Sequence, residues 1–271
     1  MFGAVYGDII GSFYEFHSTK KRDFSFQFLS RFTDDTVLTT AVCEAILDRP
    51  EEIPNSGLHD RALEYAALFR RYYRRYPHAG YGGMFIRWAK GESFDSVNSF
   101  GNGAAMRVVP IGWAYPTLEQ TMLQAKASCL ITHHHPEAIH GAQAVAAAVF
   151  LARNGCDKAE IRAYIEREFG YSFQLTLDEI RPTYSFTSRS SESVPQAIEA
   201  FLESVDYESA IRNAISLGGD ADTMACIAGG IAQAYYHMIP DEIRRFCDHR
   251  LDSSLRLKIR EFENKYSSLS Q

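Results

Sequence analysis

Two stretches far apart in the sequence combine carboxylates with threonine hydroxyls. The first is Thr33-Asp34-Asp35-Thr36, and the second is Asp220-Ala221-Asp222-Thr223. Their oxygens are hard ligands, which suit Mg²⁺, Mn²⁺ or Ca²⁺ rather than zinc or copper. Four aspartates in one compact space would repel one another strongly without a cation between them. The pattern predicts that the two clusters face each other and share a metal site with two ions.

Helix capping is the ordinary alternative explanation for each cluster. Thr and Asp are common N-cap residues, and acids in a first turn are stabilised by the helix dipole. Each cluster does lead into an apolar segment rich in small residues, 37–42 and 224–232. Segments of this kind predict buried helices, so their first turns would lie inside the protein. Capping explains either cluster alone, but two matching clusters before buried helices favour the metal site.

Residues 2–14 precede the first cluster and have the pattern of a buried helix. One face of this helix carries a glycine at every fourth position: Gly3, Gly7 and Gly11. Glycines at this spacing allow another backbone to come close, at a cost in helix propensity. Glu15 ends the segment among aromatic residues. A lone glutamate is usually solvated, so Glu15 becomes a candidate functional residue only in combination with the other motifs.

Hydrophobic periodicity and helix-ending prolines predict helices over the rest of the chain. These helices are expected at 36–48, 59–76, 117–132, 136–153, 157–168, 193–204, 207–217, 222–238, 241–250 and 253–266. Alternation typical of strands never persists for more than a few residues. We therefore expect an all-α fold, with residues 1–271 forming a single compact multi-helix domain. We expect 170–193 to be a flexible surface loop, with Ser193 as the N-cap of the next helix.

Two glycine-rich loops, 78–83 and 98–107, each precede a short apolar stretch. Backbone amides at a helix start can bind phosphate, although neither loop fits a Walker or dinucleotide-binding pattern. Three consecutive histidines follow at 133–135. Consecutive residues do not share a helix face, which argues against zinc binding there. We expect only His133 to point inward.

Composition narrows the class of protein. The formal charge of −6 and a pI near 5.9 argue against nonspecific binding to nucleic acid or anionic membranes. No apolar run reaches the length of a bilayer span, and the N-terminus lacks a signal-peptide pattern. The five cysteines are scattered and odd in number, as expected of buried thiols in a reducing compartment. These features favour a cytoplasmic, monomeric enzyme.

In combination, these motifs resemble the ADP-ribosylglycohydrolase family. The resemblance spans residues 2 to about 238 and includes 7–15, both acidic clusters, 101–107 and Thr132-His133. It implies an all-α fold, two Mg²⁺ or Mn²⁺ ions, and the removal of ADP-ribose from modified proteins or small molecules. The serine-rich segment 187–193 fits no signature of the family.

The resemblance also implies roles for individual residues. The implied metal ligands are Thr33, Asp34, Asp35, Asp220, Asp222 and Thr223. The implied substrate-binding residues are Gly80, Tyr81, Gly82, Ser99, Phe100, Gly101, Asn102, Gly103 and His133. The candidates for the catalytic base are Glu15, Asp34, Asp35 and Asp220, and the sequence does not choose among them. Phe100 is a departure, because the human serine-directed member of the family has tyrosine there.

Two other functions are compatible with the same residues. A two-metal phosphohydrolase would attack a nucleotide diphosphate at phosphorus and release AMP, whereas glycosidic cleavage releases intact ADP-ribose. A non-catalytic ADP-ribose-binding protein would be expected to have lost acids from one cluster, and all are present here. The sequence does not determine the acceptor: the substrate could be serine-linked or arginine-linked ADP-ribose, O-acetyl-ADP-ribose or another conjugate.

Overall fold

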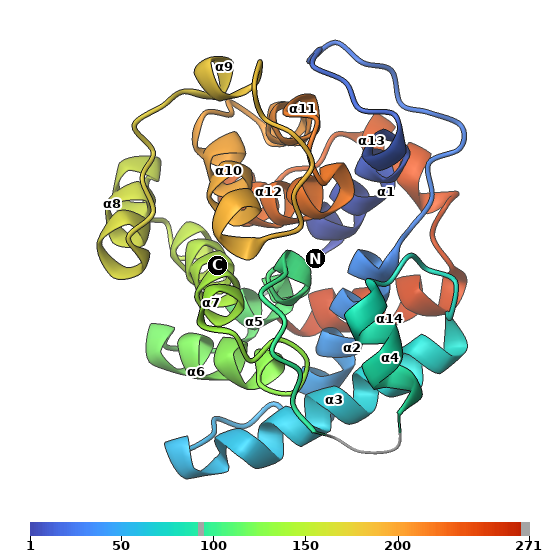
Figure 1. The fold of residues 1–271 in the computed structure, drawn as a ribbon, viewed down its shortest axis with the longest axis vertical. Coiled ribbons are helices and arrows are strands. Elements are labelled where there is room, and N and C mark those ends of the chain that lie inside the picture. Colours follow the sequence, from blue (N-terminus) through green and yellow to red (C-terminus); the bar gives the residue numbers. More distant parts are fainter. Residues whose placement is uncertain (92–94, 267–271) are drawn as a thin grey trace.

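Helix α1 (Phe2–Phe16) lies against helix α12 (Ala221–Tyr236) at the centre of the fold, although the two come from opposite ends of the chain (Figure 1). The computed structural model describes residues 1–91 and 95–266. The glycine face of α1 makes this contact. A Cβ atom on Gly7 would lie 2.0 Å from the carbonyl oxygen of Ala225, and one on Gly11 would lie 2.4 Å from that of Ala221. The predicted close backbone approach is therefore confirmed.

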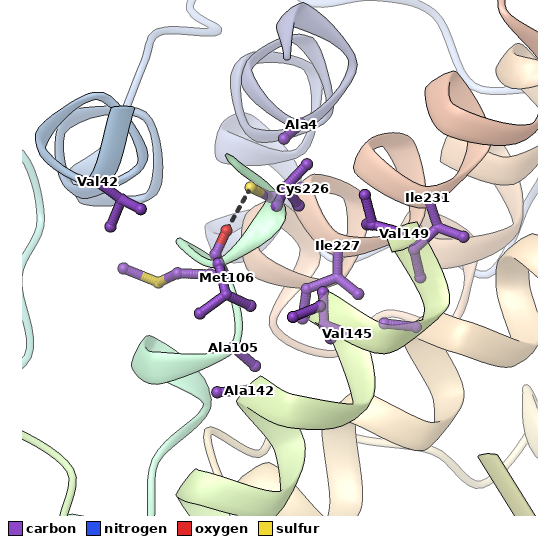
Figure 2. Packing of buried hydrophobic residues seen from close by; sticks show 14 of the residues in the cluster. Ala4, Val42, Ala105, Met106, Ala142, Val145, Val149, Cys226, Ile227 and Ile231 are labelled. Atoms are coloured by element: carbon purple, nitrogen blue, oxygen red, sulfur yellow. Dashed lines mark hydrogen bonds between the residues drawn. The ribbon is translucent and has the colours of Figure 1, made fainter. Parts of the chain in front are cut away.

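Helix α12 is buried on its other faces too, because it also packs against α7 (Pro136–Arg153), α10 (Ser190–Leu202) and α11 (Tyr207–Ser216). Figure 2 shows side chains of α12, among them Ile227 and Ile231, packed against those of α7. Burial of such apolar side chains stabilises the fold by about 25 cal/mol per Å² removed from water. The first turn of α12, with its acids, is thereby fixed inside the protein.

The remaining helices surround this centre. They are α2 (Asp34–Asp48), α3 (Leu58–Arg75), α4 (Gly83–Lys90), α5 (Val109–Ala114), α6 (Leu118–Cys129), α8 (Lys158–Phe169), α9 (Leu177–Ile180), α13 (Asp241–Asp248) and α14 (Ser253–Tyr266). Within residues 1–91 and 95–266 there are no strands, only two isolated bridges, Asn98 to His133 and Gly101 to Arg189. The expected all-α, compact multi-helix fold is confirmed. Residues 92–94 and 267–271 of the expected domain 1–271 lie outside the described part.

The region 170–193 differs from its expected form as a flexible surface loop. It contains α9 and the start of α10, which begins at Ser190 with Arg189 as its N-cap, so Ser193 lies inside the helix. Tertiary contacts explain the earlier start. The Asn102 N–H donates to the Ser188 carbonyl at 2.8 Å, and the Ser190 N–H donates to the Phe100 carbonyl at 3.1 Å. These bonds hold the segment against the loop that contains Asn102.

No helix of the described chain is long and apolar enough to cross a membrane.

Candidate active site

The two acidic clusters meet where α1, α2 and α12 converge. Carboxylate oxygens of Asp8, Asp35 and Asp222 lie within 4.8 Å of one another, and all three residues are buried. The Thr223 hydroxyl is 3.5 Å from Oδ2 of Asp35, which joins the two clusters directly. The predicted pairing of the two clusters therefore appears in the fold, together with an acid from α1 that was not among the expected site residues.

Asp8 is fully buried in the middle of α1 and accepts four hydrogen bonds from the start of α2. Its carboxylate accepts from the Thr33 N–H at 2.9 Å, the Thr33 hydroxyl at 2.7 Å and the Thr36 N–H at 3.2 Å, and from the Thr36 hydroxyl. Because these donors come from one short segment, Asp8 fixes the N-terminus of α2 against α1. The first acidic cluster is thus positioned by a carboxylate 25 residues upstream of Thr33.

Asp8 could have been found from helix geometry. Asp8, Ser12 and Glu15 stand at positions i, i+4 and i+7 of the same helix, so they lie on one face. A carboxylate among glycine and apolar residues must be paired or neutral, because burying an isolated charge is costly. The sequence before Glu15 therefore already indicated Asp8 as a second acidic candidate for the site.

Capping accounts for part of the clusters. Thr33 is the N-cap of α2, and its side-chain oxygen accepts from the Asp35 N–H at 3.3 Å. Oδ1 of Asp35, by contrast, is buried and has no hydrogen-bond partner among the described residues. Asp220 is the N-cap residue of α12 but makes no side-chain cap bond. Its Oδ2 instead accepts from the side-chain amide of Asn102 at 2.8 Å.

Burial raises the pKa of every carboxyl in this site, and neighbouring acids raise it further for all of them except Asp8. Loss of hydration raises the pKa of Asp8 to about 6 despite its hydrogen bonds. The pKa of Glu15 rises to about 7, first through burial and then through the charges of Asp220 and Asp8. Burial and then Glu15 raise the pKa of Asp222 to about 8. For Asp34, Asp35 and Asp220, burial is again the largest cause of a pKa well above the ordinary range.

The donor set fits a hard divalent cation. The converging atoms are carboxylate oxygens, and Oδ1 of Asp35 has no partner among the described residues. Burial first, and then neighbouring acids, raise the pKa of Asp35 and Asp222. Mg²⁺ and Mn²⁺ prefer such oxygen ligands, and a cation would relieve the repulsion between them. The buried acidic cluster is therefore compatible with metal binding.

A pocket of about 400 Å³ opens above the acids, within the range typical of small-molecule sites. The expected site residues that line it are Glu15, Thr33, Asp34, Asp35, Gly80, Gly82, Ser99, Gly101, Asn102, Gly103, His133, Asp220, Asp222 and Thr223. Two others point elsewhere. Tyr81 is buried between Tyr73 and Phe85, with ring centroids 5.1 and 5.2 Å away. Phe100 is 47% exposed and lies beside Arg189, whose guanidinium carbon is 5.3 Å from its ring centroid.

The glycine loops bring backbone, rather than side chains, to the pocket. Gly80 has a positive φ of 109°, which favours glycine, and a Cβ there would lie 3.4 Å from Oδ1 of Asp34. Helix α4 begins at Gly83, so its first amide groups lie at the pocket wall. On the other side, a Cβ on Gly103 would lie 3.0 Å from Nε2 of His133. The chain passes close to both the acids and the histidine at these positions.

His133 points inward, as expected, and its environment keeps it neutral. Its Nδ1 is 2.9 Å from the Thr132 hydroxyl, which in turn accepts from Nη2 of the buried Arg107 at 2.7 Å. Burial, followed by the charge of Arg107, lowers the pKa of His133 well below its ordinary value. His133 is therefore an uncharged ring at the pocket wall. His134 is exposed, and His135 is the N-cap of α7.

The serine-rich segment 187–193 contributes to the site through Asn102. The Asn102 side-chain amide donates to the Ser193 hydroxyl at 3.1 Å as well as to Asp220, and the Ser193 hydroxyl donates to the Arg189 carbonyl at 2.9 Å. Ser188 and Phe186 line the pocket. Residues that carried no recognisable sequence signal thus position an amide that contacts the second acidic cluster.

Fold and site together define an all-helical protein with a buried acidic cluster at the base of a ligand-sized pocket. The sequence profile of the ADP-ribosylglycohydrolase family matches residues 1–268, so the chain belongs to this family. Membership of this family confirms the expected enzyme class, an ADP-ribosyl-acceptor hydrolase.

Individual relatives agree with the family assignment. The chain is 28% identical to ADP-ribosylhydrolase ARH3 of Xenopus tropicalis over 312 residues, which cover 87% of this chain and 85% of that protein. It is 27% identical to the human protein of the same name, with 91% and 87% covered. A solved structure described as an ADP-ribosylglycohydrolase-related protein complex has a TM-score of 0.69 at 23% identity, and the match covers 96% of this chain and 95% of that one. This structural likeness supports the fold.

Proposed function

We propose that the protein is a dimetal-dependent hydrolase that cleaves the glycosidic bond between ADP-ribose and an acceptor and releases ADP-ribose. The observation that carries this proposal is the convergence of carboxylate oxygens of Asp8, Asp35 and Asp222 within 4.8 Å. Asp35 and Asp222 line a pocket that is also lined by glycine-rich backbone. Acids and glycine-rich backbone that line one pocket suit a ligand with a ribose diol and a diphosphate.

In this proposal, the two ions are Mg²⁺ or Mn²⁺, and the ligands are those that the family resemblance implies: Thr33, Asp34, Asp35, Asp220, Asp222 and Thr223. The ions would supply Lewis acidity and fix the orientation of the ribose diol. Asp8 accepts four hydrogen bonds from Thr33 and Thr36, so we assign it to holding the first cluster in place.

Glu15 is our choice for the catalytic base. It lies half-buried on the last turn of α1, lines the pocket, and has a pKa raised to about 7. A base with a pKa near the working pH can take a proton from water and release it again. Burial, followed by the charges of neighbouring acids, also raises the pKa of Asp34, Asp35 and Asp220, but as metal ligands they would be held in their ionised form.

The diphosphate would lie against the amides of Gly80 to Gly83 and of Gly101 to Gly103, because both segments line the pocket without side chains in the way. The uncharged ring of His133 closes the pocket beside Gly103. Tyr81 and Phe100 do not line the pocket in this arrangement, so any contact they make with substrate would require movement of their side chains.

The test is a panel of serine-linked and arginine-linked ADP-ribosylated peptides together with O-acetyl-ADP-ribose, assayed with Mg²⁺ and with EDTA. We expect intact ADP-ribose as the product, no turnover in EDTA, and recovery with Mg²⁺ or Mn²⁺. Release of AMP would instead indicate attack at phosphorus and a phosphohydrolase. Binding of ADP-ribose without turnover of any conjugate would indicate a non-catalytic ADP-ribose-binding protein. Undiminished turnover in metal-free protein would contradict the shared metal site.

A further inference from the structure

Arg31 is an exposed cation at the mouth of the pocket. Its backbone N–H donates to the Ser12 hydroxyl at 3.0 Å, which ties Arg31 to the last part of α1, and both residues line the pocket. Its guanidinium makes no ion pair or hydrogen bond with any described residue, unlike that of Arg189, which pairs with Glu137. The positive charge of Arg31 is thus available to a ligand at the mouth.

Phe16 is a second exposed residue that lines the pocket. It is the last residue of α1, directly follows Glu15, lines the pocket and is 74% exposed. A single exposed aromatic residue is common on protein surfaces. Here, however, the exposed ring and the unpaired guanidinium belong to residues that line the same pocket as Glu15. The charge of Arg31 also acts on Glu15 and lowers its pKa, although burial outweighs this effect.

The size of the pocket decides which part of a substrate these two side chains can reach. A cavity of about 400 Å³ admits a nucleotide-sized group but no folded polypeptide. In the reaction proposed above, on which this inference rests, the bond that breaks lies next to Glu15. An acceptor polypeptide must therefore remain at the mouth, where it would contact the exposed residues nearest to Glu15.

We propose that Arg31 and Phe16 form an acceptor site that selects ADP-ribosylated polypeptides with acidic residues beside the modified position. The chain as a whole has a formal charge of −6, so its overall field repels an acidic peptide, and a local cation is needed to hold one. Exposed ion pairs are individually weak, and one contact of this kind changes affinity by up to about fivefold. Phe16 provides an apolar surface that does not depend on the charge of the peptide.

The experiment uses two peptides that carry ADP-ribose through the same non-hydrolysable triazole linkage and differ only in their flanking residues, two aspartates or two lysines. Affinities are measured by calorimetry with the Mg²⁺-loaded protein. We expect the wild type to prefer the acidic peptide by about fivefold. Arg31→Gln should abolish this preference and Arg31→Glu should reverse it. Phe16→Ala should lower the affinity for both peptides by the same factor. High salt should reduce the preference of the wild type.

Arg87→Gln is the matched control, because Arg87 is also exposed and lies near the mouth but does not line the pocket. This variant should keep the preference of the wild type. Free ADP-ribose is the second control and should bind wild type and Arg31→Gln equally. Since Arg31 is exposed, these substitutions test binding without threatening the fold.

Several outcomes would overturn the proposal. These are equal affinity of the wild type for the two peptides, failure of both peptides to bind, or a loss of free ADP-ribose affinity in Arg31→Gln as large as the loss for the acidic peptide. The last result would place Arg31 on the diphosphate. A clear preference for the acidic analogue in a protein that hydrolyses no conjugate would refute the proposed hydrolase and leave the acceptor site standing.

Discussion

Asp8 shows how one buried carboxylate can organise a site from a distance along the chain. All four of its hydrogen bonds come from Thr33 and Thr36, at the start of another helix. Charge-assisted hydrogen bonds of this kind are roughly twice as strong as neutral ones. Loss of the Asp8 charge would therefore loosen both the threonines and the acids beside them.

Asp8→Asn should lower the affinity for Mg²⁺ by about 10- to 100-fold, the range found when residues that orient metal ligands are changed. An asparagine side chain keeps the shape but has one oxygen acceptor instead of two, so it cannot serve all four donors. Calorimetric titration with Mg²⁺ measures the change, and Asp60→Asn, at an exposed position of α3, is the control. Unchanged affinity would show that the site does not depend on Asp8.

Glu15→Gln should keep the fold and the binding of ADP-ribose but lose about 10²- to 10⁴-fold in turnover, the usual contribution of a general base. The amide has nearly the same shape as the carboxylate and lacks its proton affinity. Turnover on the best substrate and ADP-ribose affinity by calorimetry separate the two effects. Weakened binding with undiminished turnover of bound substrate would make Glu15 a binding residue.

Among the elements, the contact between α1 and α12 decides whether the site can form. Helix α1 carries Asp8 and Glu15, and α12 carries Asp222 and Thr223. The two backbones come close enough to bring these groups together because glycine lines the contact. Side chains at the contact would separate the helices and the acids with them.

Gly7→Ala should destabilise the protein by at least about 2–3 kcal/mol, because its Cβ would lie 2.0 Å from the Ala225 carbonyl oxygen and backbone cannot yield locally. Urea denaturation of the metal-free protein measures this loss. Gly57→Ala is the matched control, since the nearest atom to its Cβ lies at 3.4 Å, and it should change stability by less than about 0.5 kcal/mol. Equal stability of Gly7→Ala and wild type would show that the helices can move apart freely.

For the molecule as a whole, the acidic cluster links stability to pH. The pKa values of Asp8, Glu15 and Asp222 rise to about 6, 7 and 8 in the folded state. In the unfolded chain they return to about 4. Between pH 4 and 8 the folded, metal-free protein therefore binds more protons than the unfolded chain. Its stability is present at the lower pH and is lost as the pH rises through the folded-state pKa values.

In EDTA, the free energy of unfolding should accordingly fall as the pH is raised from 5 to 8, by up to about 1.4 kcal/mol per pH unit for each net proton released, and Tm should fall with it. Mg²⁺ should stabilise the protein most at pH 8, because cations compete with protons for the same oxygens. Differential scanning calorimetry at pH 5 and 8, with and without Mg²⁺, checks both effects. A Tm in EDTA that rises over this interval would contradict the crowding of the acids.

Sequence patterns were sufficient to predict the helical class, a close backbone approach at the glycine face of α1 and the pairing of the acidic clusters. Helical periodicity recurs along the chain, and the Gly3, Gly7 and Gly11 spacing leaves one helix face on which another backbone can come close. Two clusters of the same composition, each before a buried helix, indicated a shared site. These are local or repeated patterns, which a sequence displays directly.

The hydrogen bonds that Asp8 and Asn102 make at the site depend on tertiary packing, although helix geometry and the family resemblance already indicated these two residues. Asp8 bonds Thr33 because α1 packs against α2. The Asn102 amide bonds both Asp220 and Ser193 because α10 starts beside the loop at Gly101. The early start of α10 and the orientations of Tyr81 and Phe100 are set by contacts between segments distant in sequence. Local propensity carries no information about such contacts, since they depend on how whole helices pack.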